Sequence, residues 1–216
     1  MSKTNLASLI FLLLLLSNLA SCQSKVMKNQ PWYTNAAEYI KADEIMIWNA
    51  YEKKQTGLED LKLRNKTTAE LLKSQPPSIK QLKELLVSGD YLDRKVALVN
   101  IMWRNIYSED LSRDIVALNN PMDIFWVKFY SLNCFKDPDQ ETIKRFEDDL
   151  IHIYYFETDQ SILLSAMPII IRLDRSKTIP LFVKYFENGP EGLRKGAYVY
   201  TKKMGEEYFR EVKTIL

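Results

Sequence analysis

From Thr34 onward, turn-forming residues separate the apolar runs of the chain every 10 to 20 residues, as successive short helices with tight connections require. We expect about nine helices. Three pairs of residues have the spacing of a helix-starting capping box: Asn35 with Glu38, Thr67 with Glu70, and Ser78 with Gln81. Gly57, Gly89 and Gly189 follow helical segments and are predicted to end them in the left-handed conformation.

The first residues of the chain follow another pattern. Lys3 precedes an uncharged run of 11 residues, from Leu6 to Leu16, and polar residues begin again at Ser17. A membrane-spanning helix needs roughly 20 apolar residues, so this run is too short for one. A short apolar run after a positive charge is typical of a secretory signal peptide that is removed, and it predicts cleavage of residues 1–21.

Leu19, Ala20, Ser21 and Cys22 follow this run in the order aliphatic, small, small, cysteine. The order resembles the lipobox of bacterial lipoproteins. The resemblance implies that the sulfur of Cys22 receives a diacylglycerol, that the chain is cut just before Cys22, and that the new amine can be acylated too. The alternative is an ordinary secretory signal, cut near Ala20 or Ser21, which leaves Cys22 unmodified.

The residues after Cys22 set the expected location. In the lipoprotein family an Asp at the next position favours retention in the inner membrane, whereas this chain has Gln23. The resemblance therefore implies anchoring at the periplasmic face of the outer membrane, through acyl chains rather than a transmembrane helix. Residues 22–33 lack helical periodicity and are predicted to be a tether. A single all-α domain is expected over residues 34–216.

Four segments beyond residue 78 align on a small residue, seven positions after a turn-forming residue. They span residues 90–97, 120–127, 159–166 and 190–197, and the aligned residues are Ala97, Val127, Ala166 and Ala197. The spacings of 30, 39 and 31 residues lie in the range of two-helix repeats. The pattern predicts stacked helical hairpins.

Leu193, Arg194 and Ala197 stand in the order aliphatic residue, Arg, two spacers, Ala. This order resembles the second helix of HEAT-like repeats, in which the small residue lies where adjacent helices approach closely. Arg94 precedes Ala97 in the same way, whereas the segments around Val127 and Ala166 depart from the pattern. The resemblance implies a short α-solenoid from about residue 78. The alternative is an irregular helical bundle.

Composition agrees with an all-α fold. Six glycines and eight prolines are few for the turns of an all-β domain of this length, and stretches rich in Leu, Lys, Glu and Ile favour helices. The net charge is only +2, so no strong overall field attracts the chain to nucleic acid, and we expect no nucleic-acid partner.

Few residues offer chemistry. His152 is the only histidine, which excludes a metal site of several imidazoles, and we expect no metal and no cofactor. Its apolar neighbours favour a packed or half-exposed helix histidine over a catalytic base. Cys134 lies in an apolar run, which predicts a buried inert thiol. The acidic residues 147–149 are predicted to form a solvated face. No residue is predicted to be catalytic.

Charge is unevenly distributed along the second half of the chain. Residues 137–159 include eight acidic and two basic residues, and residues 172–213 include ten basic and six acidic ones. Such segments can be docking surfaces for a partner protein, or they can solvate the domain and complement each other. We favour the second interpretation.

Tyr198, Tyr200, Lys202 and Lys203 belong to the last aligned segment, and any of them that face outward are the first candidates for partner contacts. We therefore expect a membrane-anchored, noncatalytic interaction module with a protein partner in the cell envelope. One alternative is an envelope enzyme that uses unrecognised carboxylates in a helical cleft, and a third possibility is a self-contained structural lipoprotein. A deep pocket with His152 beside a carboxylate would favour the enzyme, and an exposed groove would favour binding.

The Cys22 assignment predicts the chemistry of the mature N-terminus. Mass spectrometry of the protein from membrane fractions should find a chain that begins at Cys22 and carries acyl chains. Cys22→Ser should abolish the modification and release the processed protein from the membrane. An unmodified Cys22 in the wild-type protein would exclude the lipoprotein assignment.

Overall fold

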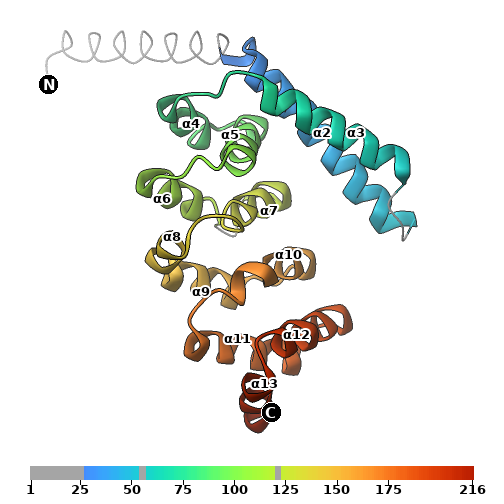
Figure 1. Ribbon diagram of the computed structural model, residues 1–216, viewed down its shortest axis with the longest axis vertical. Helices are drawn as coiled ribbons and strands as arrows, with labels where there is room; N and C mark the ends of the chain where they lie inside the picture. Colours follow the sequence, from blue (N-terminus) through green and yellow to red (C-terminus); the bar gives the residue numbers. More distant parts are fainter. Residues whose placement is uncertain (1–26, 54–56, 120–122) are drawn as a thin grey trace, which may run out of the picture. The chain divides into compact units, whose positions relative to one another are not determined.

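The computed structural model describes residues 27–53, 57–119 and 123–216, and every regular element within these ranges is an α-helix (Figure 1). The predicted all-α fold is confirmed. The described residues contain twelve helices, more than the nine or so expected. Cys22 and the preceding Leu19, Ala20 and Ser21 lie outside these ranges, so their roles stay predictions.

The chain divides into two compact units, residues 1–77 and residues 78–216. The boundary coincides with the residue at which we expected the repeats to begin, and the folding of residues 34–216 as one domain stays a prediction. The tether predicted over residues 22–33 is too long at its C-terminal end. Helix α2 begins at Pro31, and Trp32 and Tyr33 are buried in its first turn. Proline is favoured at a first helical position because no N–H is needed there.

In the first unit, α2 (Pro31–Lys53) and α3 (Leu58–Lys73) pack together as a helical hairpin. A polar contact joins them near the middle. The Arg64 Nε atom lies 2.6 Å from Oδ1 of the buried Asp43, and Arg64 also donates a hydrogen bond to the Tyr39 hydroxyl. Burial makes this pairing necessary, because an isolated buried carboxylate is costly.

The second unit consists of two rows of helices. The first row contains α4 (Ile79–Leu86), α6 (Glu109–Ala117), α8 (Gln140–Arg145), α9 (Glu147–Phe156), α11 (Arg175–Asn188) and α13 (Glu206–Ile215). The second row contains α5 (Tyr91–Arg104), α7 (Phe125–Asn133), α10 (Gln160–Ile170) and α12 (Glu191–Lys203). Each second-row helix packs against the next, from α5 in green to α12 in red (Figure 1). Pairs such as α4–α5, α6–α7 and α11–α12 connect the rows.

The four aligned small residues each lie in one helix of the second row, and all four are fully buried: Ala97, Val127, Ala166 and Ala197. Asp90, Asp159 and Pro190, which open three of the aligned segments, are the N-cap residues of α5, α10 and α12. Asn120, which opens the fourth, lies outside the described residues. The alignment thus located the second-row helices. Their assignment to HEAT-like repeats stays a prediction.

Two equivalent arginines connect the helices within a pair. Arg94 in α5 donates a hydrogen bond to the carbonyl oxygen of Ser88, and Arg194 in α12 donates one to that of Gly189. Both carbonyl groups lie in the connection from the preceding first-row helix, where helix ends leave acceptors unsatisfied. The arginines therefore hold the turn between the two helices of a pair.

The predicted helix starts were partly wrong. The capping box of Ser78 and Gln81 is confirmed at the start of α4. Asn35 and Thr67, however, lie inside α2 and α3. Asn35 donates its side-chain amide to the Glu70 carbonyl oxygen, and Thr67 bonds to carbonyl groups of its own helix. The same side chains that cap a helix can also satisfy acceptors within or between helices.

The predicted left-handed glycines were also wrong. Gly57 and Gly189 have extended backbones, and Gly89 has no positive φ. Among the described residues, the positive φ values belong to Asn105 and Gly205. Gly189 precedes a proline, which restricts the residue before it to extended conformations.

Ala166 tests how closely the interior around α10 is packed, because it is fully buried in a helix that packs against both α7 and α12. Ala166→Leu adds three carbon atoms at a fully buried position and should lower the free energy of unfolding by about 1–3 kcal/mol. Ser161→Leu, at an exposed position of the same helix, should change it by less than about 0.5 kcal/mol. Urea denaturation measures both. Equal effects would contradict the packing described.

Candidate functional site

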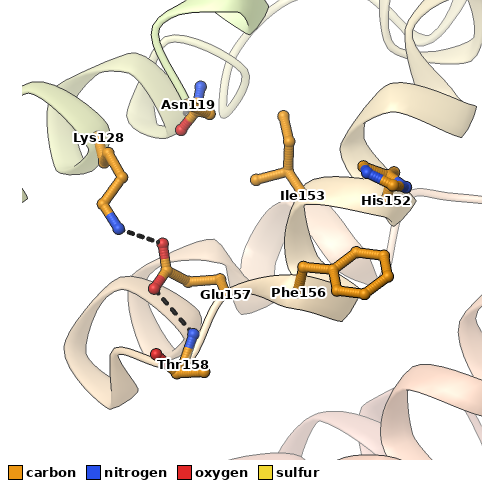
Figure 2. Close-up of a pocket in the computed structure, with 7 residues that line it drawn as sticks. All are labelled: Asn119, Lys128, His152, Ile153, Phe156, Glu157 and Thr158. Atoms are coloured by element: carbon orange, nitrogen blue, oxygen red, sulfur yellow. Dashed lines mark hydrogen bonds and ion pairs between the residues drawn. The ribbon is translucent and has the colours of Figure 1, made fainter. Parts of the chain in front are cut away.

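A surface pocket of about 460 Å³ contains the only histidine of the chain (Figure 2). It lies where α7 and the connection before it approach the C-terminal half of α9. Its lining residues are Asn119, Lys128, His152, Ile153, Phe156, Glu157 and Thr158. This is the place to look for the histidine and carboxylate that an enzyme would need.

The carboxylate in this pocket is already satisfied by the protein. Lys128 Nζ lies 2.8 Å from Glu157 Oε2, and the backbone N–H groups of Thr158 and Asp159 donate to Oε1 at 2.8 and 2.9 Å. Burial alone would raise the pKa of Glu157, but these hydrogen bonds and the Lys128 charge outweigh burial and leave the pKa lowered. Glu157 therefore connects α7 to the turn before α10 and stays ionised.

His152 is not brought to this carboxylate. The two residues lie five positions apart along the chain, which separates their directions by more than a third of a turn on a helix. The His152 ring is exposed and lies beside Phe156, with 4.7 Å between ring centroids, away from the Glu157 carboxylate (Figure 2). The pocket thus holds a histidine and a carboxylate without a catalytic arrangement of the two.

The other titratable groups considered from the sequence serve the fold. Cys134 is buried as predicted, with Sγ 3.4 Å from the Leu98 carbonyl oxygen, and burial raises the pKa of its thiol. Glu147 is buried rather than solvated, and it accepts a hydrogen bond from Lys177 Nζ at 2.7 Å.

No three metal-ligating residues cluster within the described ranges. In the same ranges, no helix has the length and hydropathy needed to cross a membrane.

The oppositely charged segments contact each other. Lys177 bonds to Asp148 as well as to Glu147, with 2.7 Å in both contacts. These contacts join α11, from the basic segment, to α9, from the acidic one. The structure thus agrees with the interpretation that the segments complement each other within the chain.

The four predicted contact residues on α12 form two separate pairs. Tyr198 packs edge-on against Phe209 of α13, and Lys202 lies over the same ring while it pairs with Glu206. Lys203 lies over the Tyr200 ring. Tyr198 and Lys203 are exposed, whereas Tyr200 and Lys202 are partly buried. Their role in partner contacts stays a prediction.

A second depression, of about 470 Å³, lies on the outer face of α12 and includes Tyr198. Its other lining residues are Glu191, Arg194, Lys195 and Val199, which we did not predict as contacts. Tyr198 is 50% exposed and Val199 is 49% exposed. The helical spacing of these residues was visible in the sequence, because positions three and four apart share a face. That this face is uncovered required the structure.

The helical hairpin of the first unit has apolar surface too. Trp48 and Tyr51 in α2 are exposed and their ring centroids lie 6.1 Å apart, and Leu58 is exposed at the start of α3. Among the residues whose burial is described, none is buried from Glu44 to Glu52 of α2 or from Leu58 to Glu70 of α3. Exposed aromatic residues of this kind are common at interfaces.

Comparison of the chain with known protein families, with curated proteins and with solved structures finds no match. The site is therefore interpreted from its own geometry.

The Lys128–Glu157 pair gives a pH-dependent prediction. Glu157→Gln should lower the free energy of unfolding by about 1 kcal/mol at neutral pH, because a charged hydrogen-bond acceptor is lost. Since the pKa of Glu157 is lowered in the folded protein, this contribution is present above the ordinary carboxylate range and disappears as the pH falls through the lowered pKa. The difference between wild type and variant should therefore shrink in acid.

Glu141→Gln is the matched control, because Glu141 pairs with Arg145 at an exposed position. It should change stability by a few tenths of a kcal/mol. Thermal or urea denaturation at several pH values compares the two variants. A Glu157→Gln difference that does not depend on pH would exclude the assigned role.

Proposed function

We propose that this protein is a lipid-anchored, noncatalytic protein-interaction module of the bacterial cell envelope. Cys22 would carry the anchor, at the periplasmic face of the outer membrane, and the helical unit of residues 78–216, a short α-solenoid, would bind another envelope protein. Neither nucleic acid nor a metal or cofactor takes part in this proposal.

One observation carries the proposal: the second row of helices presents an open apolar face at α12. Each of α5, α7 and α10 packs against the next helix of the row, and α12 is the last row helix within the described residues. Tyr198 and Val199 lie half-exposed on its outer face, around the depression described above. Exposed apolar side chains in a concave, charge-rimmed setting are typical of protein interaction sites.

The titratable groups support binding over catalysis. A general base needs a free carboxylate or imidazole within hydrogen-bond reach of a reacting atom, and a partner that orients it. In the histidine pocket Glu157 has both oxygens engaged, and His152 lies apart from it. The one carboxylate of the α12 depression, Glu191, is paired with Lys195 at 2.6 Å.

Crosslinked affinity purification of the full chain from envelope fractions tests this function. Wild-type protein should recover one envelope protein reproducibly, and Tyr198→Ala combined with Val199→Ala should reduce its recovery at least fivefold. Phe156→Ala is the control, because it removes a similarly exposed ring from another face of the same unit. Recovery of no protein, together with activity on a wall or lipid substrate, would overturn the proposal.

A further inference from the structure

The contact between α10 and α12 shows how two consecutive second-row helices pack against each other. Gly192 and Gly196 of α12 face Gln160 and Leu164 of α10. A Cβ atom on Gly196 would lie 2.4 Å from Leu164 Cδ2, and one on Gly192 would lie 2.1 Å from Gln160 Nε2. The two helices therefore approach closely because α12 carries glycines four positions apart on the facing side.

The internal alignment identifies the residues of α12 that correspond to the residues of α10 in this contact. Segment 159–166 aligns with segment 190–197, an offset of 31 residues. Gln160 then corresponds to Glu191, and Leu164 corresponds to Lys195. Both of these α12 residues line the depression of about 470 Å³. The residues of α10 that contact α12 thus correspond to residues of α12 that line the exposed depression.

From this correspondence we propose that the open face of α12 receives an amphipathic helix of the partner protein. The helix docks beside α12 as α12 docks beside α10, with small residues four positions apart on its contact side. This inference rests on the proposed function and names the chemistry of the partner. An amphipathic helix laid in a groove is a common mode of recognition.

Charge specifies the partner helix further. Arg194 lines the depression and donates to a backbone carbonyl group, but it pairs with no carboxylate of the described residues. Lys195 adds a second cation, which pairs with the exposed Glu191 at 2.6 Å. A carboxylate on the flank of the incoming helix would pair with Arg194. The partner helix is therefore acidic beside its apolar contact side.

A second copy of this chain fits the face less well. In a head-to-tail stack, α5 of the second copy would take the place of the next row helix. Segment 90–97 aligns with segment 190–197, so Leu92 and Val96 would stand where α12 has its two glycines. These larger side chains prevent the close approach, and Val96 is already fully buried within its own chain.

Fluorescence anisotropy with the full chain and a synthetic helix tests the inference. The probe is a labelled peptide of about 20 residues, long enough to be helical, with alanines four positions apart on one face and glutamates on its flanks. The wild-type chain should bind it saturably. Val199→Arg should weaken binding at least tenfold, and Phe156→Ala should leave it unchanged. Thermal melting checks that both variants fold.

The control peptide has the same composition, with the alanines moved off a common face. Equal binding of the two peptides, or no saturable binding up to about 1 mM, would overturn the helix inference. The envelope purification separates this failure from that of the proposed function. If an envelope partner is captured through Tyr198 but the helical peptide does not bind, the helix inference is wrong and the proposed function is still supported. Peptide binding without any envelope partner overturns the function instead.

Discussion

The close approach of neighbouring helices at small buried residues organises the second unit. Ala97, Ala166 and Ala197 are fully buried in the second-row helices, and Gly192 and Gly196 allow α12 to come within contact of Gln160 and Leu164 of α10. Because interiors are close-packed, a larger residue at these points would separate two helices along their whole contact. The packing of the second-row helices therefore depends on side-chain size more than on any single polar contact.

Polar contacts connect the elements that this packing brings together. Arg94 pairs with Asp123, and Lys128 pairs with Glu157, each across 29 residues of sequence. Both pairs have little exposed side-chain surface and both join a second-row helix to the turn before the next one. The charged side chains of Arg94 and Lys128 thus connect elements within the chain. Arg194 of α12 pairs with no carboxylate among the described residues, and it donates to the Gly189 carbonyl oxygen.

The proposed anchor and the proposed docking face depend on different kinds of information. The proposed lipobox is a local signal, because it consists of four consecutive residues, Leu19 to Cys22. The proposed docking face is a property of the folded unit, since the exposure of Tyr198 and Val199 depends on which helices pack against α12. A membrane anchor and an open helical face together favour a protein that binds its partner close to a membrane.

The all-α class, the capping box at Ser78 and the positions of the second-row helices could be predicted from the sequence, because they depend on nearby residues and on a repeated small side chain. Helix starts were misplaced at Asn35 and Thr67, since capping side chains also serve inside helices when a neighbouring helix supports them. The separation of His152 from Glu157 and the partial exposure of Tyr198 and Val199 on α12 became visible only in the folded chain, because both depend on which helices pack together.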